Sequence, residues 1–155
     1  MDPSPPIELQ RLSTALDSGG LPAALRLLNE RTPFRFTGVY RFDGDTLRNV
    51  ALFDRWMPAL TLGHDAPMND TFCAITAGSN APLEVTDGHH DPRFPSMQAN
   101  PVESYCGTPI RDGGGHPIGT LCHFDVKSCE SVSSELPLLA HAATLFRPFL
   151  DVRPA

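Results

Sequence analysis

The sequence predicts an α+β domain, in which an antiparallel sheet carries helices on one face and long irregular segments over the other. Three observations lead to this prediction. Apolar residues recur at helical spacing near both ends of the chain, two stretches between them alternate like β-hairpins, and two long segments without a sustained period separate the strands. With 155 residues, the chain is long enough for one hydrophobic core and too short for two. We therefore expect a single domain over residues 1–155.

Two helices are expected near the N-terminus. Apolar residues recur at near-helical spacing over residues 7–17, and the glycine pair at 19–20 supplies a stop. A second helix is expected over 22–31, because Pro22 suits the first turn of a helix and Pro33 forbids its continuation.

The strands are expected to form two hairpins and one further strand. The stretch "FRFTGVYRF" from Phe34 alternates large apolar and polar residues, "DGD" turns the chain, and "TLRNVALF" alternates again. The stretch "PLEVTDG" from Pro82 reads as the third strand. A second hairpin joins Val102–Arg111 to Pro117–Val126 around "DGGGH", whose glycines can take the positive φ angles of a tight turn.

Two irregular segments lie between these strands. Residues 54–70 contain two prolines, a glycine and the only tryptophan, and "HHDPRFPSMQANP" from His89 forms the second segment, with room for one helical turn. Segments of this length in a compact domain are often functional. Asn69 or Asp70 is expected to cap a short helix that runs through Ala77 and ends at Gly78.

The last predicted element is a helix over 134–149. Ser134 is the expected cap, Pro137 fits the first turn, and apolar residues recur at helical spacing from Leu138 onward. Pro148 is expected to end or kink this helix, and Pro154 adds a second interruption.

Composition and charge exclude several classes of protein. Eighteen acidic residues against twelve basic ones give a formal charge of −6, which repels phosphate backbones, so we expect no nucleic-acid partner. No apolar run approaches the roughly 20 residues of a membrane span, and the acidic, proline-rich start does not look like a signal peptide. We expect a cytoplasmic protein without a membrane partner.

The four cysteines are expected to be reduced thiols. Cys73, Cys106, Cys122 and Cys129 show no sign of a secreted framework, and a chain of this length needs no disulfides. None of them stands in a CxxC or CxxH spacing, so the signature of a structural zinc site is missing.

Three stretches carry a resemblance to a known family. They are "FTGVYRFDGDTLRNVALFDR", "PLEVTDGHHDPRF" and "SYCGTPIRDGGGHPIGTLCHFD". In this order and spacing they resemble the GAF family of small-molecule-sensing domains, over about Leu21 to Phe149. The resemblance makes residues 21–149 the core and 1–20 a helical extension. It implies an α/β/α sandwich with a central antiparallel sheet of five to six strands, terminal helices that pair into a homodimer, and short caps over a ligand pocket.

Side chains alternate along a strand, so the last hairpin divides its residues between the two faces. Tyr105, Cys122 and Phe124 belong to one face, and the resemblance makes this the pocket face. Cys106 and His123 belong to the other. With the two irregular segments above it, the pocket is expected to be lined by eight residues. These are Trp56, Phe72, Cys73, His90, Phe94, Tyr105, Cys122 and Phe124.

An enzymatic function is also suggested by the same resemblance. Free methionine-(R)-sulfoxide reductases are single GAF domains whose cysteine nucleophile attacks the sulfoxide and is resolved by other cysteines. Cys73 falls near one cysteine of that family, but the catalytic position falls near Met97, and the acidic pocket positions are not acidic here. We therefore expect thiols that line the pocket rather than catalytic ones, with Cys73 and either Cys106 or Cys122 as the redox alternative.

Metal binding and core packing are competing interpretations for several residues. His89, His90 and Asp91 could ligate a metal together with His64, but such residues on loops more often form solvated turns, and no metal is expected.

Trp56 could fill the core instead of contacting a ligand, and the domain could be a purely structural dimerisation module. The motifs identify neither the ligand nor a cofactor, and cyclic nucleotides have no signature in this chain.

The sequence thus predicts a non-catalytic sensory or regulatory domain. A small molecule that orders the caps better in one state would bias the geometry of the terminal helices. The chain would act on a signalling partner in trans or be one domain of a longer protein.

Overall fold

The central sheet has six strands in the order β3-β2-β1-β6-β5-β4, and every neighbouring pair is antiparallel. The computed structural model of the protein describes residues 5–69 and 71–150. The strands are β1 (Phe36–Asp43), β2 (Thr46–Asp54), β3 (Ala66–Pro67), β4 (Leu83–Val85), β5 (Ser104–Arg111) and β6 (Pro117–Asp125). The α+β class predicted from the sequence is confirmed, with the sheet at the upper end of the predicted five to six strands.

Both predicted hairpins are present and lie side by side. Strand β1 pairs with β6 in the middle of the sheet, with Gly38 opposite Cys122 and Tyr40 opposite Thr120. The one strand that the sequence analysis missed is β3, because its two residues carry no periodicity and pair only with the start of β2.

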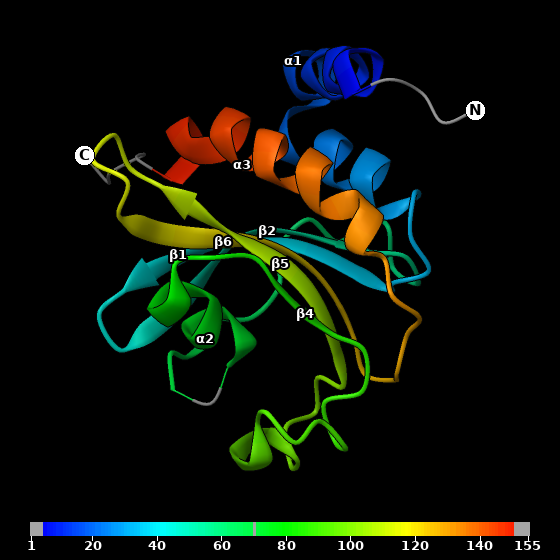
Figure 1. Cartoon of the computed structure of the whole chain (residues 1–155). Coiled ribbons are helices and arrows are strands. Elements are labelled where there is room, and N and C mark those ends of the chain that lie inside the picture. Colours follow the sequence, from blue (N-terminus) through cyan, green and yellow to red (C-terminus); the bar gives the residue numbers. More distant parts are fainter. Residues whose placement is uncertain (1–4, 70, 151–155) are drawn as a thin grey trace.

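Helices α1 (Pro5–Asn29) and α3 (Leu136–Leu150) cover one face of the sheet (Figure 1). The two helices predicted before residue 32 join into α1, which is kinked at Gly20, where φ is 70°. Glycine takes this left-handed conformation without steric strain. The glycine pair, predicted to stop the first helix, therefore kinks α1 and does not end it.

The start of α3 differs from the prediction. Ser134 lies inside the short 3₁₀ turn η2 (Ser133–Glu135), so it does not cap the helix. Pro148 lies inside α3 and does not end it, because Phe146 and Leu150 on either side of it are buried and hold the last turn in place. Pro154 lies outside the described residues.

Helix α2 (Phe72–Ser79) and the 3₁₀ turn η1 (Pro95–Met97) lie on the opposite side of the sheet from α1 and α3 (Figure 1). The N-cap of α2 is Thr71, whose hydroxyl accepts a hydrogen bond from the Ala74 amide at 3.1 Å. The helix ends at Asn80 in the left-handed conformation rather than at Gly78. The predicted cap Asn69 is therefore wrong, and Asp70 lies outside the described residues.

The sheet separates two hydrophobic clusters, and the predicted division of the last hairpin is confirmed. Leu121 and Cys106 belong to the cluster under α1 and α3. Tyr105 and Cys122 belong to the cluster on the α2 side. Among the described residues, no helix is long and apolar enough to cross a membrane.

Candidate ligand cavity

A cavity of about 120 Å³ lies between the sheet, α2 and the two irregular segments. The side chains that line it come from β1, β2, β3, β5, β6, α2 and both segments. They are Tyr40, Leu47, His64, Ala66, Thr71, Phe72, Cys73, Asn100, Val102, Tyr105, Cys122 and Phe124. None of these side chains is a carboxylate, an ammonium or a guanidinium, so the walls offer hydrogen bonds and apolar contact but no fixed charge.

Glycines on the cavity face let two tyrosine rings lie flat along the strands. The Tyr105 ring crosses Gly107, and a Cβ added at Gly107 would collide with the Tyr105 hydroxyl. Tyr40 crosses Gly38 on β1 in the same way. The Tyr105 hydroxyl therefore reaches α2, where it lies 3.2 Å from the Thr76 hydroxyl and 3.6 Å from the Cys73 sulfur.

Cys73 is held at the start of α2 by several donors. The Thr120 hydroxyl donates to its sulfur at 3.1 Å and the Tyr105 hydroxyl at 3.6 Å, and the Cys122 thiol is a neighbour. The interaction with Cys122, followed by the bonds from Thr120 and Tyr105, lowers the pKa of Cys73 although it is buried. Burial, followed by the same contact with Cys73, raises the pKa of Cys122 well above its usual value. The cavity wall thus contains two neighbouring thiols whose pKa values are shifted in opposite directions, and both belong to the lining predicted from the sequence.

Cys106 does not belong to this pair. It faces the cluster under α1 and α3, and burial raises its pKa to about 12. All four cysteines are free. Of the two partners proposed for Cys73 from the sequence, the structure places Cys122 in contact with it.

Five of the eight predicted lining residues border the cavity. They are Phe72, Cys73, Tyr105, Cys122 and Phe124. Phe94 does not line the cavity but packs edge-on against Phe72, which does, with ring centroids 6.0 Å apart. Trp56 lies elsewhere, because the guanidinium of Arg35 stacks 4.0 Å from its ring and leaves it 69% exposed. His90 is also outside the lining, since Asp87 holds it at the surface.

Sequence reasoning missed seven lining residues, for two different reasons. Tyr40 lies on β1 and Leu47 on β2, where side chains point alternately to the two faces. Once β1 is known to pair with β6, this alternation assigns both residues to the cavity face. His64, Ala66, Thr71, Asn100 and Val102 come from or next to irregular segments, where no sequence period reports which way a side chain points.

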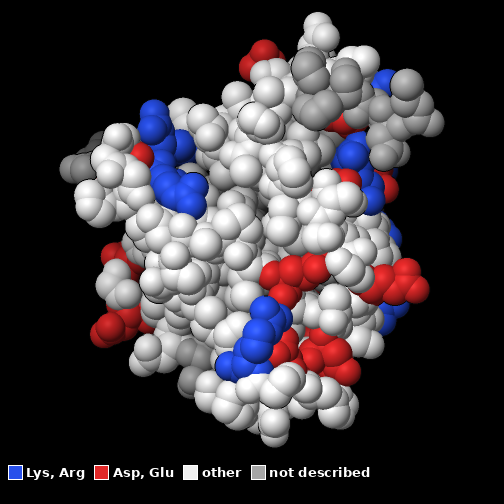
Figure 2. Space-filling view, in the orientation of Figure 1, with Lys and Arg blue, Asp and Glu red and all other residues white. Residues whose placement is uncertain are grey.

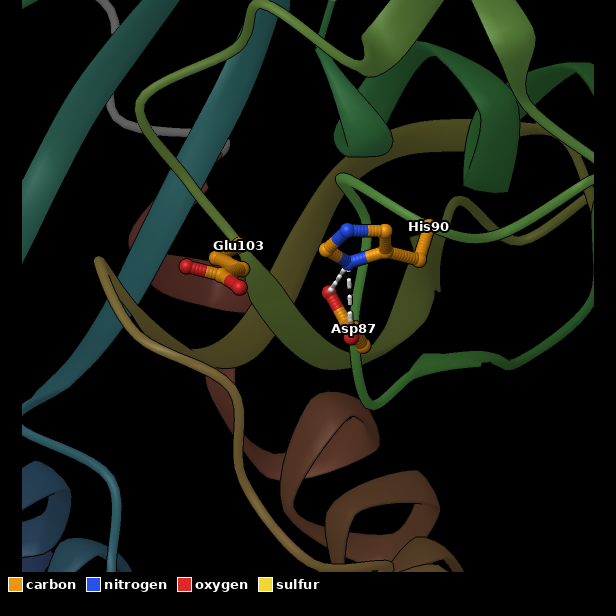
Figure 3. A group of neighbouring side chains, drawn as sticks. All are labelled: Asp87, His90 and Glu103. Atoms are coloured by element: carbon orange, nitrogen blue, oxygen red, sulfur yellow. Dashed lines mark hydrogen bonds and ion pairs between the residues drawn. The ribbon is translucent and has the colours of Figure 1, made fainter.

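A separate cluster of titratable residues lies next to the cavity (Figure 3). Atoms of Asp87, His90 and Glu103 lie within 4.8 Å of one another. The hydrogen bond from His90, at 3.0 Å, contributes most to lowering the pKa of Asp87. Asp91, which the sequence groups with His90, instead receives the Arg93 guanidinium at 2.8 Å.

The comparisons with known proteins place this fold in a family. The GAF domain model matches residues 21–147, and the chain therefore belongs to the GAF family, whose members are in general sensory or regulatory domains. A comparison with curated proteins gave no significant match.

Solved structures with the same fold include two kinds of protein. The GAF domain of an Acinetobacter phosphoenolpyruvate-protein phosphotransferase superposes with a TM-score of 0.74 at 10% identity, over 97% of this chain and 94% of that one. The free methionine-R-sulfoxide reductase of Neisseria meningitidis, solved with its substrate, gives 0.68 at 16% identity, over 97% and 92%. The type II free methionine-R-sulfoxide reductase of Thermoplasma acidophilum gives 0.63 at 19% identity, over 90% and 94%.

Proposed function

We propose that the protein is a non-catalytic sensory domain that binds a small, uncharged molecule in the cavity under α2. The observation that carries this proposal is the lining itself, which joins apolar walls to a few polar groups and contains no carboxylate, ammonium or guanidinium. A carboxylate or ammonium group brought into such a site would lose its hydration without gaining an ionic partner. The Tyr40 and Asn100 side chains offer the kind of polar contact that orients a neutral ligand.

The volume limits the size of the ligand. An apolar cavity of about 150 Å³ accommodates benzene, so the 120 Å³ seen here fits a molecule of only a few heavy atoms. A larger ligand requires the segments on either side of α2 to move outward. Such a movement is the event by which binding would be sensed.

The signal would leave through the terminal helices. Strand β6 contacts the cavity through Cys122 and the helix-side core through Leu121, so a shift on one face is felt on the other. A ligand that favours one arrangement would change the populations of two states. The readout would be the geometry of a homodimer formed through α1 and α3, or contact with a signalling partner in trans, in the cytoplasm.

A thermal-shift screen of neutral metabolites, with charged ones as comparison, tests the proposal. A true ligand at a hundred times its dissociation constant stabilises the fold by about 2.7 kcal/mol. Val102→Phe narrows the cavity and should abolish the shift, whereas Val126→Phe, at a valine that is 50% exposed, should retain it. The proposal fails if no neutral molecule stabilises the protein, or if Val102→Phe responds like the wild type.

The contact between Cys73 and Cys122 favours a second candidate, a redox enzyme of the free methionine-(R)-sulfoxide reductase type. The Cys73 thiol would take the sulfoxide oxygen, which makes it a sulfenic acid and releases methionine. The Cys122 thiol would then displace that oxygen as water to form a disulfide, which an external thiol reductant reduces. Against this candidate, the lining has no Asp or Glu for the ammonium of free methionine sulfoxide and no Lys or Arg for its carboxylate.

An activity assay separates the two candidates. A wild-type rate of methionine sulfoxide reduction that disappears in Cys73→Ser and persists in Cys106→Ser would establish the enzyme. If the wild type shows no turnover with a thiol reductant present, the sensory proposal stands.

A further inference from the structure

The segment between β4 and β5 brings four potential metal ligands together from two stretches of sequence. Asp87, His89 and His90 follow β4, and Glu103 directly precedes β5. The backbone fixes their proximity, because the Gly88 amide donates to the Glu103 carbonyl at 2.6 Å. A Cβ at Gly88 would be only 3.1 Å from that carbonyl oxygen and from the Phe72 ring, so the absence of a side chain permits this approach.

We infer that Asp87, His90 and Glu103 form a binding site for a first-row divalent cation, with His89 as a further ligand. Two carboxylates and two imidazoles make up a mixed oxygen and nitrogen donor set, which suits Zn²⁺, Mn²⁺ or Fe²⁺ better than Ca²⁺ or Mg²⁺. Metal–ligand bonds of about 2.0 to 2.2 Å require the three groups, now within 4.8 Å, to close slightly around the ion. The His90 side chain is 79% exposed and can rotate to do so.

The contact between the two carboxyl groups points to a cation. One carboxylate oxygen of Asp87 and one of Glu103 lie within 4.8 Å of each other. When both groups are ionised, they repel each other, and a divalent ion between them removes the repulsion. Figure 2 shows acidic atoms near β4 and the segment that follows it, with a basic side chain running between some of them.

The orientation of His89 is an independent indication. Its Nε2 lies 2.9 Å from the Asn100 carbonyl oxygen, which can only accept, so Nε2 carries a proton. The other ring nitrogen, Nδ1, faces the Glu103 carboxylate at 3.5 Å. Metal-binding histidines are typically oriented in this way, by a carbonyl that receives the proton of the other ring nitrogen.

The site adjoins the cavity wall. Asn100 lines the cavity and is the residue whose carbonyl holds His89. A bound ion would therefore order the segment that closes one side of the cavity. This last consequence rests on the proposed function, whereas the metal site itself does not.

Calorimetric titration of the full chain with ZnCl₂ tests the site. One equivalent should bind to the wild type, and His90→Ala and Glu103→Gln should each weaken binding at least tenfold. His116→Ala is the matched control, because His116 forms a similar exposed pair with Asp112, at 3.5 Å, but has no third ligand nearby among the described residues. This variant should bind like the wild type. All substitutions are near the surface, and circular dichroism checks that each variant is folded.

A second measurement distinguishes this site from the thiol pair. With Co²⁺ as the probe, nitrogen and oxygen ligands give no thiolate charge-transfer band, and Cys73→Ser with Cys122→Ser should leave binding unchanged. The inference is overturned by an absence of saturable binding, by unchanged affinity in His90→Ala and Glu103→Gln, or by a thiolate band. Val102→Phe is designed to block the cavity and should still bind the metal. A failure of the cavity proposal and a failure of the metal site therefore give different results.

Discussion

At the scale of single residues, the buried imidazole of His123 links the stability of the fold to pH. It is fully buried, stacks on Phe34, and its Nδ1 lies 2.7 Å from the Thr37 hydroxyl, while its Nε2 has no partner among the described residues. The Thr37 hydroxyl accepts a hydrogen bond from the Asn29 side chain, so its own O–H can donate to Nδ1 of His123. In that arrangement Nδ1 is the acceptor, Nε2 carries the ring proton, and the imidazole is neutral. Burial, with a smaller contribution from Arg55, lowers the pKa of His123 to about 3.

This lowered pKa predicts a loss of stability in mild acid. The unfolded chain binds a proton at His123 near the ordinary pKa of about 6.5, whereas the folded chain does not. The contribution is therefore complete above pH 6.5 and is lost as the pH falls toward 3, by up to about 1.4 kcal/mol per pH unit. Urea unfolding between pH 7 and pH 4 measures the slope. His123→Phe should flatten it and His141→Phe, at an exposed position on α3, should not; equal slopes in all three proteins would contradict the assignment.

A second prediction at this scale concerns Gly107. Alanine at this position would displace the Tyr105 hydroxyl from Thr76 and Cys73. A buried hydroxyl without its partners costs about 1 to 3 kcal/mol, and the free energy of unfolding in urea should fall by that amount. Tyr105→Phe should reproduce part of the loss. Gly113→Ala, where no atom lies within 4 Å of the added Cβ, is the control and should be neutral. A Gly107→Ala protein as stable as wild type would show that Tyr105 is not held across the strand.

The residues of the cavity were predictable to the extent that they stand on regular strands. Alternation placed Tyr105, Cys122 and Phe124 on one face of the sheet, and the family resemblance identified that face as the cavity side. It could not exclude Trp56, whose position depends on a stacking contact with Arg35 from a distant turn. The sequence offered both Cys106 and Cys122 as partners for Cys73 and could not choose between them, because the choice depends on how α2 packs against β6.

At the scale of elements, the cap of α2 makes the clearest test. Thr71 accepts a hydrogen bond from the Ala74 amide and lines the cavity, so it fixes where Cys73 stands in the first turn. Thr71→Ala should lower the free energy of unfolding by about 1 kcal/mol. Asn69→Ala, at the position that the sequence pattern favoured as the cap, should change it by less than about 0.5 kcal/mol. The reverse order in urea unfolding would show that the helix begins two residues earlier.

Hairpins were easier to predict than caps and short strands. The stretches on either side of "DGD" and "DGGGH" carry both a period of two and turn residues, and these two signals agree about the same boundary. Thr71, Asn69 and Asp70 are all good capping residues, so local chemistry could not choose between them. Strand β3 forms only because the irregular segment folds back onto the edge of β2.

At the scale of the whole molecule, one arginine ties together segments that are far apart in sequence. Arg31, just after α1, donates to Glu8 in the first arm of α1 at 2.8 Å and to Glu135 in η2 at 2.7 Å. The side chains of both glutamates are largely buried, with 6% and 12% of their surface exposed. The ion pairs thus fix the N-terminal arm to the start of α3, which are the elements proposed to carry the signal.

Removing Arg31 should therefore destabilise the protein far more than removing an exposed arginine. Arg31→Met leaves Glu135 without its cation and, among the described residues, leaves Glu8 with only the exposed Arg11, at 3.5 Å. Loss of one partner of a buried ion pair costs about 3 to 5 kcal/mol. The 30% exposure of Arg31 places the expected loss at the lower end, about 3 kcal/mol. Arg26→Met is the matched control, because its pair with Glu30 is more than 60% exposed on both sides and should contribute less than about 1 kcal/mol. Urea unfolding at pH 7 compares the two variants. Hydrogen exchange should show the α1 arm losing protection in Arg31→Met, and equal stability of the two variants would mean that the arm is held by its apolar face alone.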